Sequence, residues 1–199
     1  MTPWIILLAL AMLALIAVVW AVALYNGLVT VRNRFINAFS QIDVQLKRRH
    51  DLIPNLVETT RAYLAHEAGT LEAVIAARSS AVSAGARAAA DPTDPSAMSG
   101  MMAAEGALGA GLGRLLAISE NYPQLKADAT CSQLREELAS TENRIAFARQ
   151  AYNDAVMVYN TARELVPTSF IAGACNFRPA MPYEIDDQSH RAAPVVKLT

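Results

Sequence analysis

The first 24 residues are almost entirely apolar and carry no charged side chain. Only Thr2 and Pro3 fall outside the hydrophobic set. From Pro3 to Leu24 the segment has 22 residues. As an α-helix it is about 33 Å long, which is enough to cross a hydrocarbon core of about 30 Å. The pattern therefore predicts a transmembrane helix over residues 1–24.

Aromatic side chains stand at both ends of this span, as is typical of the two membrane–water interfaces. Trp4 lies near one end, and Trp20 and Tyr25 lie near the other. A cleaved signal peptide is the alternative interpretation, because residues 21–23 read Ala-Val-Ala. A signal peptide also needs a basic segment before the apolar stretch, and none is present. We therefore expect an uncleaved anchor.

Positive charge is confined to the C-terminal side of the span. Arg32 and Arg34 follow it, and a Lys-Arg-Arg run occupies positions 47–49. The positive-inside rule then predicts a short N-terminus outside and a C-terminal domain in the cytoplasm. On a straight helix Arg32 and Arg34 lie about 12 and 15 Å beyond Leu24, within reach of lipid headgroups, whereas positions 47–49 lie about 35 Å away.

Beyond residue 25 the apolar positions recur in steps of three and four, the spacing of one face of a helix and close to a heptad. This stripe continues to about residue 84 and begins with Phe35, Phe39, Ile42 and Leu46. Pro54 interrupts it, because proline removes one helical hydrogen bond and clashes with the preceding turn. We predict that the rod kinks at Pro54, or restarts there with Asp51 as the N-cap.

Proline-rich stretches separate the later helices. Residues 90–96 (ADPTDPS) predict a loop, and a third helix is expected over 97–120. Pro123 begins a fourth helix that keeps the heptad register to Val166. From residue 168 the chain is expected to be irregular. We expect the first half of this tail to pack back onto the helices through Phe170, Phe177 and Tyr183. The last ten residues are not expected to pack.

These elements predict an all-α fold, in which an N-terminal transmembrane helix continues into an antiparallel bundle of long helices, of the four-helix type. The expected parts are an anchor (1–24), a helical bundle domain (25–167) and an irregular C-terminal tail (168–199). Composition agrees, because 38 of the 199 residues are alanine, the best helix former. The net charge of −1 argues against nucleic acid as a partner.

No segment carries a complete catalytic or metal-binding motif. His66 and Glu67 open like the H-E-x-x-H motif of zinc proteases, but the fifth position is Thr70. A di-iron bundle needs two Glu-x-x-His units, and none exists. We therefore expect no enzymatic activity, no catalytic residue, no cofactor and no metal. The acidic side chains of the fourth helix predict a solvated surface paired to nearby arginines: Glu136, Glu137, Glu142 and Asp154.

A glycine-rich segment within the third helix resembles a nucleotide-binding loop, with Gly106, Gly109, Gly111 and Gly113. Such a loop follows a strand, and no strand is predicted here. Glycine costs about 1 kcal/mol against alanine inside a helix. The segment therefore indicates a close approach by another element, or a local hinge.

Two polar patterns repeat every seven residues, which places each of them on one helix face. Asn26 and Asn33 form the first with Ser40, and the dipeptides Tyr152-Asn153 and Tyr159-Asn160 form the second. Buried asparagines can fix helix register by pairing their amides. We therefore predict that these stripes set helix register or oligomer contacts. The alternative is that they border the core and bind water.

Four segments of the chain are long and specific: RNRFINAFSQIDVQLKRRHDLIPNLVE (32–58), TLEAVIAAR (70–78), GRLLAISENYPQLKAD (113–128) and TENRIAFARQAYNDAVMVYN (141–160). Through these segments, residues 25–167 resemble the LemA family of bacterial membrane proteins. The resemblance implies a single-pass protein of the bacterial inner membrane with a helical bundle and no established enzymatic activity. It also implies a link to magnetosome membranes in one branch and to membrane metalloproteases encoded nearby in others. Relatives often have Phe-Pro at positions 166–167 and Gly-Phe at 176–177, where this chain has Val-Pro and Asn-Phe.

The expected function is that of a non-enzymatic membrane-anchored scaffold, which homo-oligomerises and organises or shapes the membrane. Its partners are then lipid and further copies of itself. Ala17 and Ala21 offer a small face within the span for such contacts. The first alternative is an adaptor for another membrane protein, such as a membrane metalloprotease in envelope quality control. The second is an enzyme or a ligand-binding bundle.

Overall fold

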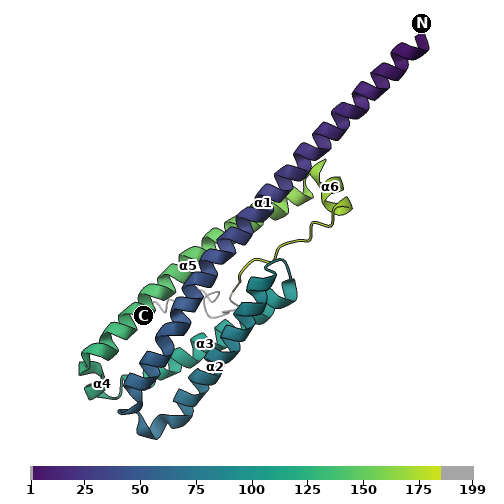
Figure 1. The fold of residues 1–199 in the computed structure, drawn as a ribbon. Coiled ribbons are helices and arrows are strands. Elements are labelled where there is room, and N and C mark those ends of the chain that lie inside the picture. The colour runs from purple at the N-terminus through teal and green to yellow at the C-terminus, as the bar shows by residue number, and fades with distance from the viewer. Residues whose placement is uncertain (1, 185–199) are drawn as a thin grey trace, which may run out of the picture.

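The computed structural model describes residues 2–184, and within them every regular element is helical. Figure 1 shows α1 and α5 side by side along most of the molecule, with α2 and α3 as a hairpin against them. The expectation of an all-α bundle of long antiparallel helices is thereby confirmed. The helices are α1 (Thr2–Arg61), the 3-10 turn η1 (Ala65–Glu67), α2 (Ala68–Ala90), α3 (Pro95–Ser119), α4 (Pro123–Ala127), α5 (Ala129–Glu164) and α6 (Thr168–Ala174).

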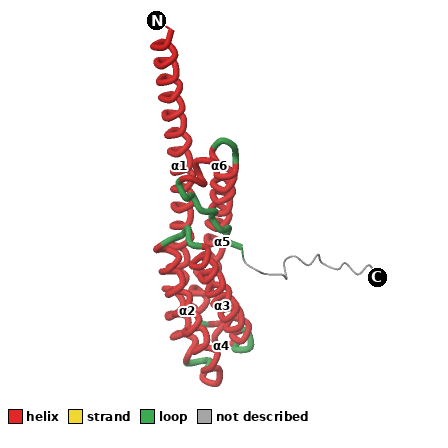
Figure 2. Tube along the Cα trace, turned by 90° about the vertical axis from the view of Figure 1, so that its right-hand side faces the viewer, coloured by secondary structure: helices red, strands yellow, loops and turns green. Residues whose placement is uncertain are grey.

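The first part of α1 stands alone beyond the bundle (Figures 1 and 2). Its most apolar stretch has a mean hydropathy of 3.1 and no buried residue, so it is a candidate membrane span. Helix α3 is also long and apolar enough to cross a membrane. It packs along α2 instead, and one of its buried side chains is the carboxylate of Glu105. These features make α3 a bundle helix.

Helix α1 runs through Pro54 without a break, so the prediction that a new helix restarts near Asp51 is wrong. Proline has no N–H to donate to the carbonyl four residues back, which here belongs to His50. The Nε of Arg78, on α2, donates to that oxygen at 2.6 Å. Because a side chain replaces the lost helical bond, the rod continues to Arg61.

Two breaks in the helices were absent from the predicted pattern. The chain reverses between Arg61 and Ala68, where a continuous helix was expected. Threonines precede this break, and Thr60 turns its hydroxyl back onto the carbonyl of Leu56 at 2.8 Å, a bond that competes with regular helix. The predicted fourth helix is split at Asp128, whose carboxylate accepts from the N–H of Cys131 at 2.8 Å and caps α5.

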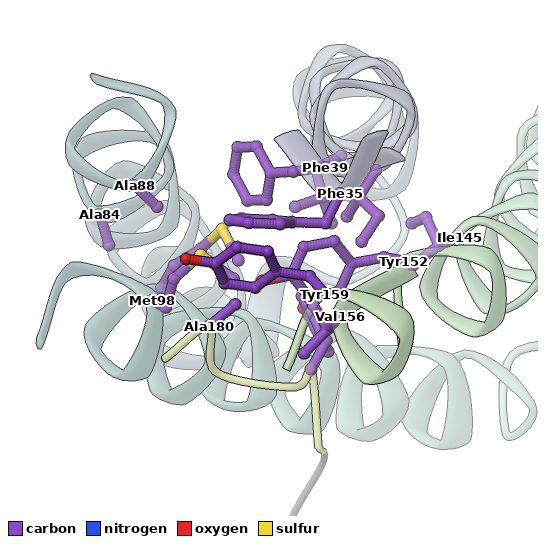
Figure 3. Close-up of a cluster of buried hydrophobic side chains, with 14 of the residues drawn as sticks. Phe35, Phe39, Ala84, Ala88, Met98, Ile145, Tyr152, Val156, Tyr159 and Ala180 are labelled. Atoms are coloured by element: carbon purple, nitrogen blue, oxygen red, sulfur yellow. The ribbon is translucent and has the colours of Figure 1, made fainter. Parts of the chain in front are cut away.

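The buried apolar side chains form two clusters, one after the other along the bundle. The first cluster lies nearer the candidate span, and in Figure 3 Phe35 and Phe39 pack over Tyr152 and Tyr159. The Phe35 and Tyr159 rings are 4.9 Å apart, within the range of favourable aromatic pairs. The second cluster lies at the far end and contains Ile53, Leu56, Val74, Leu108 and Leu115.

The tail is more ordered than predicted. Residues 168–174, expected to be irregular, form α6, because this turn can bury Ala172 against α1 and α5. The expectation that the first half of the tail packs back is confirmed for Phe177 and Tyr183, which are 7% and 3% exposed. It is wrong for Phe170, which is 73% exposed. The last ten residues lie outside the described part of the chain.

Candidate functional site

A layer of charged side chains separates the two apolar clusters. Arg49 and His50 come from α1, Glu105 from α3 and Glu142 from α5. On each of these helices the charged residues lie between the two clusters. The neighbours in the first cluster are Leu46, Met101 and Ile145. The neighbours in the second cluster are Leu52, Leu108 and Leu138. We call Arg49, His50, Glu105 and Glu142 the ion layer.

Glu105 is the centre of the ion layer and is 4% exposed. Its Oε1 lies 2.8 Å from the Nε2 of His50, and its Oε2 accepts from the guanidinium of Arg49. The other guanidinium nitrogen of Arg49 donates to Glu142 at 2.8 Å. Buried charges persist only when they are paired and hydrogen-bonded. Both terminal nitrogens of the Arg49 guanidinium are paired in this way, whereas its buried Nε has no partner among the described residues.

The electrostatics of this layer favour the ionised forms of Arg49 and Glu105. Burial alone would lower the pKa of Arg49, but the charges of Glu105 and Glu142 raise it above the usual value. Burial alone would raise the pKa of Glu105, but the hydrogen bond with His50 and the charge of Arg49 bring it below its usual value. A core residue at position 105 would be apolar in a simple bundle, and burying these charges costs desolvation that their mutual pairing offsets.

A cavity of about 840 Å³ opens beside the ion layer. Arg49, Glu105 and Glu142 line it together with Arg149 and Tyr183. The guanidinium of Arg149 stacks 5.1 Å from the centre of the Tyr183 ring. The described residues hold no cluster of His, Cys, Asp or Glu suited to a metal ion. Two of the carboxylates at the cavity, Glu105 and Glu142, are bound to arginine and histidine, and these bonds connect α1 with α3 and α5.

The two Tyr-Asn dipeptides of α5 bind the backbone of the tail. The Asn160 amide donates to the carbonyl of Ala180 at 2.9 Å and accepts from its N–H at 3.0 Å. Asn153 makes the same pair of bonds with Tyr183, at 3.1 and 2.7 Å. The phenol groups add bonds to the carbonyls of Met181 and Arg178, at 2.8 and 2.7 Å. We call Tyr152, Asn153, Tyr159 and Asn160 the tail clamp.

The tyrosines at this surface are held as neutral hydrogen-bond donors. Burial raises the pKa of Tyr152 to about 12 and raises that of Tyr159 as well, although Arg32 and Arg163 oppose the change. Burial also raises the pKa of Tyr183 to about 12. A phenol that stays protonated keeps its donated bond to a carbonyl, so these contacts persist across the physiological range.

The remaining predicted residues lie apart from this region. Trp4 and Trp20 are exposed on the candidate span, whereas Tyr25 packs edge-on against Phe177 with ring centres 5.6 Å apart. Four residues lie on the surface of α1: Asn26, Arg32, Asn33 and Arg34. The first Asn stripe is therefore exposed in the single chain, and its predicted part in assembly stays a prediction.

Sequence reasoning placed Glu142 on a solvated surface with arginines of its own helix, but its partner is Arg49 of α1. It missed Glu105 altogether. A signal for Glu105 exists, because it occupies the apolar stripe Met98, Met101, Glu105, Leu108, Leu112 and Leu115. A charged residue at such a position points to a buried partner.

Within the described part of this chain, the glycines of α3 do not mark a close crossing with another helix. Among the described residues, a Cβ added at Gly106, Gly109 or Gly113 meets nothing within 4 Å, and one added at Gly111 lies 3.6 Å from Val74, an ordinary contact. Nor do they form a hinge, since α3 is continuous from Pro95 to Ser119. The face that these small side chains form is exposed among the described residues 2–184.

The fold defines a helical bundle protein with one candidate N-terminal membrane span. The chain belongs to the LemA family, whose model matches residues 38–198. It is 28% identical to magnetosome protein MamQ of Magnetospirillum gryphiswaldense, in an alignment 189 residues long that covers 87% of this chain and 70% of that protein. It is also 28% identical to magnetosome protein MamQ 2 of Paramagnetospirillum magneticum, over 78% of this chain and 63% of that protein. The chain thus spans about two thirds of the length of these relatives.

Proposed function

We propose that this protein is a non-enzymatic scaffold, anchored in the bacterial inner membrane, that homo-oligomerises and organises or shapes that membrane. The observation that carries the proposal is the continuity of α1. One helix of 60 residues contains both the candidate span and one wall of the bundle. At 1.5 Å per residue it is about 90 Å long. A rod without a joint transmits the orientation of the bundle to the anchor, which is what a membrane scaffold needs.

The surface of α3 supports the self-association in this proposal. Its exposed small side chains recur in steps of four and three, at Ser99, Ala103, Gly106, Ala110 and Gly113. Small residues on one helix face let a second helix approach closely. The similarity to magnetosome proteins supports a role in membrane organisation.

An adaptor for another membrane protein is the second candidate. It is favoured by the large apolar side chains that α5 leaves in solvent, of which Phe147 is 74% and Met157 63% exposed. Exposed aromatic and methionine side chains are enriched in protein interfaces. Both candidate functions depend on binding surfaces and neither depends on a catalysed reaction. Identifying the bound partner therefore distinguishes the two.

Co-purification of two differently tagged full-length copies from one cell, after detergent extraction, tests the proposal. We expect the second copy to be recovered in a fixed ratio with the first. Recovery of one other membrane protein in a fixed ratio, without the second copy, would favour the adaptor. Recovery of neither would contradict both.

The proposed topology places the bundle in the cytoplasm. Cys175 is exposed while Cys131 is buried, so a maleimide reagent that does not cross the membrane reports on the side of the tail. We expect Cys175 to be protected in intact cells and labelled after the inner membrane is opened. Labelling in spheroplasts before that step would place the bundle outside.

A further inference from the structure

The corner between α5 and α6 exposes apolar side chains at one end of the bundle. Leu165 is 58%, Val166 75% and Phe170 73% exposed. Charged or polar residues would be expected at the end of a bundle that faces water. The three side chains therefore form an apolar patch that the described part of the chain leaves uncovered.

This corner lies at the level where the candidate span of α1 ends. Tyr25 contacts Phe177, just beyond α6, and Leu28 is buried in one cluster with Ala172. Figures 1 and 2 both show α6 beside α1 where α1 leaves the bundle. Within the predicted span, Ala21 and Leu24 are half-buried on the face that continues to Leu28. The apolar surface of the anchor and that of the corner are thus continuous.

Basic side chains lie beyond the end of the span, on the side of the bundle. Arg32 and Arg163 are close enough to Tyr159 to affect its pKa, and Arg178 accepts a bond from the same tyrosine through its carbonyl. Arg32 is about 12 Å beyond Leu24 along the helix, at the depth of lipid headgroups. Glu164 is also near, but it is paired with Arg163 at 3.0 Å. Asp91 lies near Arg32 and Arg178 and offsets part of their charge.

We propose that the α5–α6 corner is a second membrane contact, which inserts Leu165, Val166 and Phe170 into the interface of the bilayer that α1 spans. The inference rests on the proposed anchoring. An apolar patch rimmed by arginines is the composition that binds at the boundary between headgroups and acyl chains. Together with the anchor, this contact fixes the tilt and rotation of the bundle, which a single helix crossing the bilayer does not.

Depth-dependent fluorescence quenching tests this contact on the full chain in lipid nanodiscs. An environment-sensitive fluorophore is attached at Phe170→Cys in a Cys175→Ser background, with buried Cys131 left in place. Phe147→Cys is the matched control, because Phe147 is 74% exposed but lies 18 residues before Leu165 on α5, about 27 Å away. Met12→Cys, within the candidate span, reports on the anchor itself.

We expect the label at position 170 to lose fluorescence with lipids that carry a quencher near the headgroup, and to lose less when the quencher is deep in the acyl region. The label at 147 should not respond to either lipid, and the label at 12 should respond most to the deep quencher. No quenching at 170 together with quenching at 12 would overturn the second contact while leaving the anchor. No quenching at 12 would overturn the anchoring and the inference with it. A label at 170 that is shielded from both lipid and aqueous quenchers would mean that protein covers the corner, which also overturns the inference.

Discussion

Asn160 binds both backbone groups of Ala180, donating to its carbonyl and accepting from its N–H. An extended segment in a sheet forms such a pair of backbone hydrogen bonds with a neighbouring strand. Here a side-chain amide takes the place of that strand. Asn153 repeats the arrangement with Tyr183, one heptad earlier on α5. The two asparagines of the seven-residue repeat therefore hold the tail at two positions, Ala180 and Tyr183.

Replacing both amides should release the tail from the bundle. In Asn153→Leu/Asn160→Leu, four hydrogen bonds to tail backbone are lost, and each buried group left unpaired costs about 1–3 kcal/mol. We expect faster hydrogen exchange at residues 178–183, measured by mass spectrometry. Asn55→Leu, at an exposed position of α1, is the control.

The same double variant tests the prediction that the asparagines govern assembly. A changed size of the detergent-extracted protein would support that prediction. An unchanged size and unchanged melting behaviour of the assembly would rule it out. Exchange at 178–183 that stays as slow as in the unsubstituted chain would contradict the tail clamp itself.

Arg78 and Pro54 should be energetically coupled although they do not bond to each other. Arg78→Ala leaves the carbonyl of His50 without a partner and should lower the free energy of unfolding by about 1–3 kcal/mol. In Pro54→Ala the new N–H can supply the helical bond to that carbonyl, so the same Arg78→Ala change should cost less. Chemical denaturation of the four proteins of this cycle measures the coupling.

Arg78→Ala could instead lower the free energy of unfolding equally with proline and with alanine at position 54. That result would contradict the role of Arg78 in keeping α1 continuous. Arg87→Ala controls for the general effect of losing an arginine from α2, because Arg87 is exposed on the same helix. Its cost should be small and independent of position 54.

Glu105 should matter more to stability than Glu142, although both bind Arg49. Glu105→Gln removes a carboxylate that is almost fully buried, and breaking a buried pair from one side costs about 3–5 kcal/mol. The side chain of Glu142 is 51% exposed although its partner Arg49 is buried, so water can solvate the site and Glu142→Gln should cost less than Glu105→Gln. Thermal unfolding followed by circular dichroism compares them, and equal costs would show that the ion layer is not buried as described.

The ion layer also predicts how stability responds to acid. The pKa of Glu105 in the fold lies below its ordinary value of 4.5, so the fold favours the ionised carboxylate. Its contribution is therefore complete above pH 4.5 and is lost as the pH falls through the lower pKa of the folded state. The stability difference between the unsubstituted chain and Glu105→Gln should shrink over that acidic range. A difference that stays constant there would contradict the lowered pKa.

The sequence predicts those features that depend on local chemistry. The apolar run and the start of a helix at Pro123 lie where the pattern places them, and the loop predicted at residues 90–96 is present but shorter, at 91–94. The reversal before Ala68 was not predicted, because it contains no proline and its one nearby glycine, Gly69, lies inside α2. Thr60 and the buried Leu64 form it through contacts that depend on the packed bundle.

The site was harder to predict than the fold because its partners are distant in sequence. His50 and Glu105 are 55 positions apart, and Arg49 and Glu142 are 93 apart. The Tyr-Asn repeat was visible as a pattern, but its partner is backbone at positions 178–183, which no residue type reveals. The spacing of residues in the sequence shows which side chains share a helix face. The packing of the helices determines which residues that face contacts.

The small-residue stripe of α3 gives the most direct variant for self-association. Gly106→Leu/Gly113→Leu fills space that is open in the single chain and replaces two glycines with a better helix former, worth roughly 1 kcal/mol each. We expect the bundle to be at least as stable and the assembly to be smaller. Gly69→Leu, at another open and exposed glycine, should leave the size of the assembly unchanged.

The mass of the full chain after detergent extraction, measured by native mass spectrometry over a range of protein concentrations, tests the scaffold most directly. The account predicts a defined multiple of the 21.4 kDa chain that falls towards one copy in Gly106→Leu/Gly113→Leu. A mass of one chain at every concentration would contradict it.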